Sequence, residues 1–229
     1  MAIEKQRLNK YLALQLGISR READDFIAAG EVKINETVAT LGARFVEGDK
    51  ITINSKPVAS DTAMVYIAFH KPVNYVCSRK QQGDSPTIYD IIPREYHTLK
   101  PVGRLDRDSS GLILLTNDGD FAYEMTHPKF IKTKIYQVTL DHDLEPLHQQ
   151  MISDHGINLE DGVSKLQLER RSDDERKSWT ITMHEGRNRQ IRRTFNSLGY
   201  DVIKVHRPDF GPYTIGHLAS GKLETVTKK

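Results

Sequence analysis

The sequence of 229 residues has a single cysteine, Cys77, and a single tryptophan. One cysteine excludes an internal disulfide bond and any zinc site built from several thiolates. No apolar run approaches the roughly 18 residues that a membrane-spanning helix needs. The amino-terminal segment MAIEKQRLNKYL has no apolar core of the kind that marks a secretion signal. We therefore expect a soluble, cytoplasmic protein with reduced thiol chemistry and no membrane partner.

The signature motifs of several enzyme classes are also missing. The nine histidines are scattered, and the sequence contains no His-Glu-x-x-His pair for zinc, no Gly-x-Ser-x-Gly elbow and no glycine-rich dinucleotide fingerprint. We accordingly expect neither a metal nor a cofactor. A glycoside hydrolase would need two carboxylates flanking the scissile bond. Asp106 and Asp108 are close in sequence, but we expect no catalytic role for Asp108.

Positive charge is concentrated near the carboxyl end of the chain. The net charge is +2 overall, but it is −6 over residues 61–175 and +7 over residues 176–229. Solvated lysines can produce such a distribution, yet the segment EGRNRQIRR (185–193) holds four arginines. Because the guanidinium group presents a planar fork of donors to an oxyanion, this cluster favours contact with the phosphates of a polyanion.

The first sixty residues have the pattern of a small unit of two helices and a sheet. Apolar residues recur at helical spacing in RLNKYLALQLG (7–17), where Leu8, Leu12 and Leu16 would share one face. Ser19 and Glu22 then form a capping-box pattern that predicts the start of a second helix ending at Gly30. Alternating segments at 31–38 and 49–53 predict short strands.

The rest of the chain is rich in strand patterns. The turn-rich segment KPVASDT (56–62) predicts a linker, so we expect domains at residues 1–60 and 61–229. Strands are expected at 64–72, 112–116, 134–140, 165–170 and 178–184, and helices at 119–127, 143–153 and 187–199. Since strands dominate and helices are scattered, the sequence predicts an α+β fold with a largely antiparallel sheet.

The segment PVGRLDRDSSGLILLTNDGD (101–120) concentrates charge just before an apolar strand. A surface turn with locally paired charges is the simplest interpretation. A calcium loop starting at Asp106 is rejected, because Asn117 stands where an EF-hand needs a bidentate glutamate.

Resemblance to known families suggests a third interpretation. Residues 5 to about 58 resemble the small RNA-binding domain named after ribosomal protein S-four, through RLNKYLA, SRREADDFIAAG, KIN and EGDKITIN. A generic two-helix module with solvated arginines remains the alternative. The resemblance implies that Lys10, Arg20 and Arg21 face RNA phosphates.

The remainder of the chain resembles the pseudouridine synthases of ribosomal RNA (RsuA, RluB and RluF types). The matching segments are VGRLDRDSSGLILLTNDG, HKPVNYV (70–76), KIYQVTL (134–140) and HEGRNRQIRRTFNSLGYDVIKVHR (184–207), in the family's order. The resemblance implies isomerisation of a uridine in ribosomal RNA or in pre-ribosomal particles. Two of the motifs look closer to the large-subunit RluB and RluF branches than to the small-subunit one.

The resemblance also assigns roles to individual residues. Asp106 would be the catalytic aspartate, Tyr136 would stack on the target base, and Arg192 would pair with the Asp106 carboxylate. The alternative partner of Asp106 is Arg187. Further RNA-binding residues implied by the matching motifs are Arg104, Ile191, Arg187, Arg189 and Lys71.

The chemistry of this reaction suits these residue types. The isomerisation moves a glycosidic bond from a base nitrogen to a base carbon without electron transfer, so a single carboxylate can serve as nucleophile or proton acceptor. The target nucleotide must be flipped out of a helix to be reached. A non-catalytic RNA-binding or ribosome-assembly factor is the alternative function. We expect the protein to be a monomer.

Overall fold

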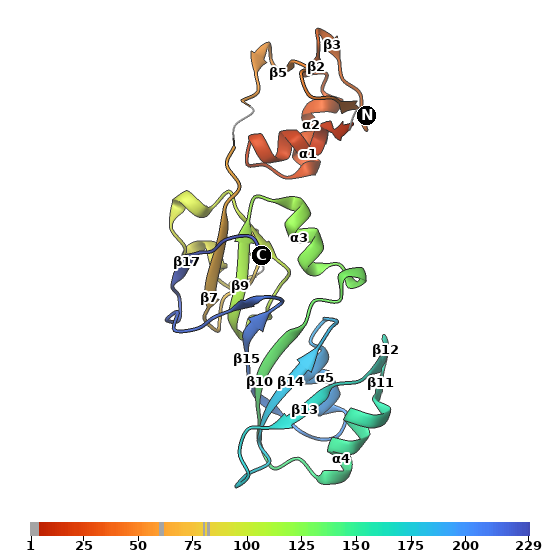
Figure 1. Ribbon diagram of the computed structural model, residues 1–229, viewed down its shortest axis with the longest axis vertical. Coiled ribbons are helices and arrows are strands. Elements are labelled where there is room, and N and C mark those ends of the chain that lie inside the picture. The colour runs from red at the N-terminus through yellow and green to blue at the C-terminus, as the bar shows by residue number, and fades with distance from the viewer. Residues whose placement is uncertain (1–4, 60–61, 80, 82) are drawn as a thin grey trace. The chain divides into compact units, whose positions relative to one another are not determined.

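The computed structural model describes residues 5–59, 62–79, 81 and 83–229 and divides the chain into two compact units, residues 1–65 and 66–229 (Figure 1). Each unit contains its own cluster of buried apolar side chains. The predicted domain boundary between residues 60 and 61 lies outside the described residues. Among the described residues, we find no helix with both the length and the apolar character that crossing a bilayer requires.

Two helices of the first unit follow the sequence pattern. They are α1 (Leu8–Gln15) and α2 (Arg20–Ala28). The predicted capping box is present, because Ser19 Oγ accepts from the Glu22 amide and the Glu22 carboxylate accepts from the Ser19 amide. Leu8 and Leu12 are buried as expected. Leu16 was expected on the same face but is 42% exposed, because the helix ends before it.

Short hairpins complete the first unit. Strands β2 (Val32–Ile34), β3 (Thr37–Val38), β5 (Ile51–Ile53) and β6 (Lys56–Pro57) form one sheet, and β1 (Gln6–Arg7) pairs with β4 (Arg44–Phe45). Asn35 and Glu36 both have positive φ, as a two-residue turn between right-twisted strands requires. The segment predicted as a linker, residues 56–62, begins with β6, which pairs with β5 at the edge of this sheet.

The second unit is built on a nine-stranded sheet. Its main order is β13-β14-β10-β15-β9-β7-β17, with β16 added to β15 and β8 to β9. All pairings are antiparallel except that of β15 with β9. The predicted α+β fold with a largely antiparallel sheet is thus confirmed. The strands are β7 (Tyr66–Lys71), β8 (Lys100–Val102), β9 (Ser110–Thr116), β10 (Lys134–Leu140), β13 (Gln167–Arg170), β14 (Ser178–Met183), β15 (Val202–Phe210), β16 (Tyr213–Thr214) and β17 (Leu223–Thr225).

Helices and one hairpin flank this sheet (Figure 1). The α-helices are α3 (Gly119–Thr126), α4 (Pro146–Gln150) and α5 (Gln190–Asn196), and the chain after α4 continues as a π-helical turn, Met151–His155. Strands β11 (Ile157–Leu159) and β12 (Gly162–Ser164) form a separate hairpin. Single 3-10 turns lie at Ile88–Asp90, Arg94–Tyr96 and Pro128–Phe130. Asp118 caps α3 by accepting from two amides of its first turn, and Tyr66 donates to the same carboxylate.

Candidate active site

A pocket of about 270 Å³ lies in the second unit, where the loop from β8 to β9 meets β10, β15 and α5. It brings together most of the site residues that the sequence predicted. Those that line it are Arg104, Asp106, Tyr136, Arg187, Arg189, Ile191 and Arg192. Among the described residues of its lining, Asp106 is the one carboxylate, and it stands among five arginines and one lysine.

The loop that carries Asp106 is held by a buried lysine. Lys71 ends β7 and is fully buried. Its ammonium group donates to the main-chain oxygens of Pro72 at 2.9 Å, Asp106 at 3.0 Å and Ser109 at 2.7 Å. Burial lowers the pKa of Lys71 to about 8, and the negative charges of Asp106 and Asp108 oppose that shift only in part.

This position corrects the prediction that Lys71 binds RNA. A side chain without exposed surface cannot reach a phosphate, and its three donors already bind the carbonyl groups of Pro72, Asp106 and Ser109. Sequence reasoning failed here because a lysine close to a predicted basic site is normally solvated. Lys71 instead fixes the backbone of the loop from Asp106 to Ser109.

Tyr136 lies in β10 opposite a bulge of the neighbouring strand. The β10–β15 register shifts between Ile135 and Gln137, which places an extra residue of β15 across from Tyr136. Pro208 lies in that part of β15 and has no amide proton for the ladder. Bulges of this kind redirect side chains beside active sites. The Tyr136 ring, 8% exposed, forms part of the pocket wall.

Arg207, a residue to which the sequence assigned no role, lies beside Tyr136. It is 2% exposed, its Nη1 lies 3.5 Å from the Tyr136 hydroxyl and its guanidinium carbon lies 5.9 Å from the centre of that ring. Nε and Nη2 donate to the Leu112 carbonyl at 3.0 and 2.8 Å. The sequence offered a signal, since Arg207 is the last residue of the closing basic motif, but arginine side chains are mostly exposed in folded proteins, so its burial was not expected.

Arg192 contacts Asp108 and not Asp106, which corrects the predicted ion pair. Its Nε lies 3.2 Å from Asp108 Oδ2, and its Nη2 donates to the Asp108 carbonyl at 3.1 Å. Arg189 approaches the same carboxylate in a two-pronged arrangement, at 3.0 and 3.2 Å. Arg189 precedes α5 in the left-handed region, with φ of 46°, and Arg192 lies in the first turn of that helix.

The surroundings of Asp108 stabilise its charged form. Burial alone would raise the pKa of the Asp108 carboxyl, but the hydrogen bond from Arg189 and the charges of Arg192 and Arg189 outweigh burial and hold that pKa below its usual value. Nothing in the local sequence distinguishes the setting of this carboxylate from that of Asp106, two residues before it. In the structure, Asp108 lies outside the pocket lining, and its carboxylate holds two arginines, Arg189 and Arg192, that line the pocket.

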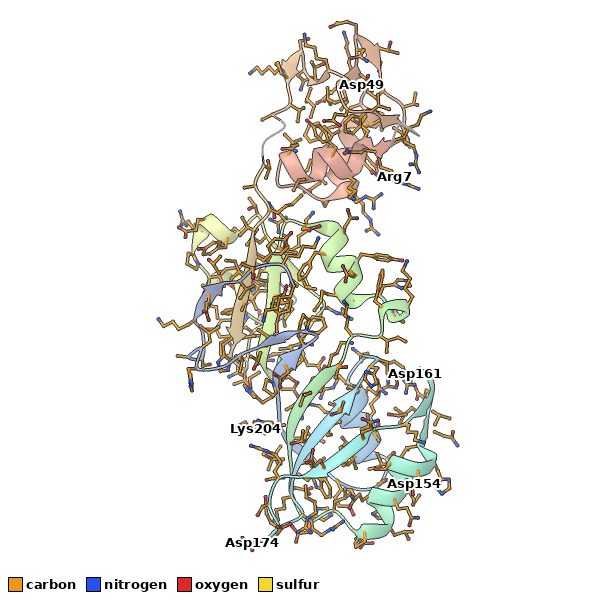
Figure 2. The ribbon with its side chains drawn as sticks, in the orientation of Figure 1. Arg7, Asp49, Asp154, Asp161, Asp174 and Lys204 are labelled. Carbon is orange, nitrogen blue, oxygen red and sulfur yellow. The ribbon has the colours of Figure 1, made fainter. Side chains whose placement is uncertain are left out.

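Arg187, the alternative partner of Asp106, binds the β11–β12 hairpin. Its Nη1 donates to the main-chain oxygens of Asp161 and Gly162 and lies 3.0 Å from the Asp161 carboxylate, while Nη2 donates to the Val163 carbonyl. Arg193 reaches the same carboxylate at 2.6 Å. Figure 2 shows Asp161 at the tip of that hairpin. The hydrogen bonds of Arg187 therefore attach this pocket-lining residue to the β11–β12 hairpin, and none of the described contacts joins Arg187 to Asp106.

The other predicted residues occupy two different settings. Arg104 is exposed at the pocket rim, and Ile191, 6% exposed, lines the pocket from α5. In the first unit, Lys10, Arg20 and Arg21 are exposed. Arg20 also donates to Asn9, which itself binds the Asp24 carboxylate.

Comparisons with known proteins agree with this architecture. The model of the RNA pseudouridylate synthase family matches residues 65–197, and the S4 domain model matches residues 6–51. A crystal structure of a pseudouridylate synthase superimposes with a TM-score of 0.68 at 30% identity and covers 96% of each chain.

Three curated relatives show the same breadth of similarity. Ribosomal large subunit pseudouridine synthase B of Bacillus subtilis is 34% identical and covers 97% of this chain and 92% of its own. Ribosomal small subunit pseudouridine synthase A of Yersinia pestis is 31% identical, with 96% and 94% covered. The dual-specificity RNA pseudouridine synthase RluF of Salmonella typhi is 34% identical, with 96% and 75% covered. Both family resemblances inferred from the motifs are thus confirmed, and the chain belongs to the RNA pseudouridylate synthase family and carries an S4 domain.

Proposed function

We propose that the protein isomerises a uridine of ribosomal RNA, in the large subunit, to pseudouridine, with Asp106 as the catalytic carboxylate. The observation that carries the proposal is the pocket in which one carboxylate stands among six cationic side chains. The named relatives act on ribosomal RNA of either subunit. The large subunit is preferred because GRLDRDSSG and EGRNRQIRR resemble the large-subunit branches more closely.

The reaction balances without an external reactant. The bond from ribose C1′ to uracil N1 breaks, and a bond from C1′ to C5 forms. C5 loses a proton and N1 gains one, so no electrons enter or leave. Asp106 acts as nucleophile or as proton acceptor, and the Lys71 ammonium group holds its backbone in place.

The remaining pocket residues bind and orient the flipped nucleotide. Tyr136 offers its ring for stacking on the uracil, and Ile191 adds an apolar wall. Arg104, Arg189 and Arg192 line the same pocket, and their guanidinium groups bind the phosphates of the flipped nucleotide and its neighbours in this proposal. Positioning of this kind lowers the barrier by removing the entropy cost of aligning base and carboxylate.

Replacing Asp106 with asparagine tests the catalytic assignment. Asp106→Asn keeps the shape but removes the negative charge, so turnover is expected to fall by about three powers of ten or more. RNA affinity is expected to hold or improve, because a negative charge leaves a basic pocket. The assay is release of tritium from C5 of labelled uridine in ribosomal RNA, with folding checked by circular dichroism.

A matched control uses an aspartate far from the pocket. Asp174 lies in the turn between β13 and β14 (Figure 2), and Asp174→Asn should leave turnover and affinity unchanged. If folded Asp106→Asn turned over at the wild-type rate, the catalytic assignment would fail and the RNA-binding alternative would replace it. Mapping pseudouridines in both ribosomal RNAs, with and without the gene, decides between the subunits.

A further inference from the structure

Residues 127–133 form an exposed turn that leaves the pocket rim and returns to it. Thr126, the last residue of α3, lines the pocket, and so does Lys134, the first residue of β10. The chain between them makes a 3-10 turn beside α3 before it enters the sheet (Figure 1). Whatever binds in the pocket and extends beyond it on this side therefore passes close to this turn.

Three aromatic rings gather on the turn and on the adjoining face of α3. The centres of the Tyr123 and His127 rings are 4.6 Å apart, and those of Tyr123 and Phe130 are 5.8 Å apart with their edges turned to faces. Tyr123 is 47% exposed and Phe130 is 38% exposed. We call Tyr123, His127 and Phe130 the aromatic platform. Because these rings leave so much surface in water, burial in the core does not explain them.

Local contacts hold the platform in shape. The Lys129 amide lies 3.3 Å from His127 Nδ1, and Ile131 ends the turn in the left-handed region with φ of 47°. Lys132 forms an ion pair with Glu124 of α3 at 2.9 Å, which joins the two ends of the turn. A ligand would therefore meet rings that are already arranged, and their ordering would cost little.

Charge identifies the chemistry of the partner. The Lys129 ammonium group lies 4.6 Å from the centre of the Phe130 ring and 5.2 Å from that of Tyr123. No ion pair between described residues includes Lys129, whereas Lys132 is neutralised by Glu124. Exposed aromatic side chains beside a cation, next to a basic pocket, are the features that bind single-stranded nucleic acid by stacking and phosphate contact.

We propose that the aromatic platform stacks unpaired bases of the RNA strand that flanks the target uridine. This inference rests on the proposed function, since the RNA strand whose uridine enters the pocket is the strand that would contact the platform. An apolar protein partner would leave the charge of Lys129 without a counterpart. An RNA strand would place bases on the rings and a phosphate beside the ammonium group.

Fluorescence anisotropy with a labelled single-stranded oligouridylate tests the platform in the full-length protein. Tyr123→Ala and Phe130→Ala should each weaken binding about five-fold or more, because each removes a stacking surface. Tyr123→Phe keeps the ring and should bind as the wild type does. Leu147→Ala is the matched control, since Leu147 is an apolar residue of α4 that is 62% exposed.

A second variant keeps the test decisive if a ring variant is unstable. Lys129→Ala removes only an exposed side chain and should reduce the slope of log affinity against log salt by about one. Unchanged affinity in both ring variants and an unchanged slope in Lys129→Ala would overturn the proposal. So would wild-type dimers, seen by light scattering, that the ring variants lose while they bind RNA normally, because the platform would then join two copies of the chain.

Tritium release from ribosomal RNA separates this proposal from the proposed function. If the wild type released no tritium but the ring variants lost oligouridylate affinity, the platform would stand and the assigned reaction would fail. If the wild type were active and the ring variants bound and turned over normally, the reaction would stand and the platform would fail.

Discussion

At the scale of single residues, two aspartates separated by one position have opposite surroundings. Asp106 lines the pocket, whereas the Asp108 carboxylate contacts Arg189 and Arg192 outside the lining. Sequence reasoning identified the loop and expected Arg192 beside Asp106. It could not assign the partner, because Arg189 and Arg192 lie 81 and 84 residues from Asp108 along the chain, and a local pattern does not show contacts across such separations.

Asp108→Asn should impair turnover without unfolding the protein. The change removes the charge that holds Arg189 and Arg192 at the pocket, so turnover should fall about 10- to 100-fold through loss of alignment. The ion pairs are partly exposed, with the Asp108 side chain 45% accessible, so the free energy of unfolding should change by less than about 1 kcal/mol. Tritium release and urea unfolding measure the two effects. Wild-type turnover in this variant would show that the arginines keep their places without Asp108.

Lys71→Met should lower both the free energy of unfolding and the turnover. The variant keeps the length of the side chain but leaves the carbonyl groups of Pro72, Asp106 and Ser109 without their shared donor. Hydrogen bonds to a charged group contribute about 1.5–3 kcal/mol, so we expect a loss of about 3 kcal/mol in the free energy of unfolding. Lys165→Met is the control, because the exposed Lys165 binds a single carbonyl. Equal unfolding midpoints in urea for the two variants would contradict the role given to Lys71.

At the scale of elements, local pattern predicted five of the nine strands in the sheet of the second unit and missed its central strand. Residues 134–140 were predicted as a strand and form one with the same bounds, because β-branched and apolar residues alternate there. Strand β15 was not predicted. It contains Pro208 and the buried Arg207, whose charge is compensated by contacts with the Leu112 carbonyl and the Tyr136 ring. Those contacts come from distant parts of the chain, which a local pattern cannot show.

Gly111→Ala should disrupt the parallel contact between β9 and β15. Gly111 has φ of 121°, and a Cβ atom there would lie 2.3 Å from the Arg207 carbonyl oxygen. Because the three nearest atoms all belong to the Arg207 backbone, relief requires the strands to separate, and we expect a loss of about 3 kcal/mol or more in the free energy of unfolding. Gly119→Ala is the control, since a Cβ atom there would meet nothing within 4 Å. Similar melting temperatures for the two variants would contradict the close approach.

At the scale of the whole molecule, the exposed cations and the pocket are divided between two units with separate cores. The first unit carries the exposed Lys10, Arg20 and Arg21, and the second carries the pocket. The S4 match over residues 6–51 and the synthase match over residues 65–197 follow the same division. Phosphate contacts position a protein on RNA without contributing to bond breaking. The first unit should therefore contribute affinity, and the second should contain the chemistry.

Deleting residues 1–60 separates these two contributions. The truncated protein keeps the core and pocket of the second unit, so it should still release tritium from a saturating RNA fragment. Its affinity for folded ribosomal RNA should fall, and the slope of log affinity against log salt should decrease by about one for each phosphate that the first unit no longer binds. The full-length Arg20→Ala and Arg21→Ala variants should each show a part of the same decrease. A folded truncated protein with the affinity and salt slope of the full chain would place all RNA binding in the second unit, and the exposed cations of α1 and α2 would then have no part in it.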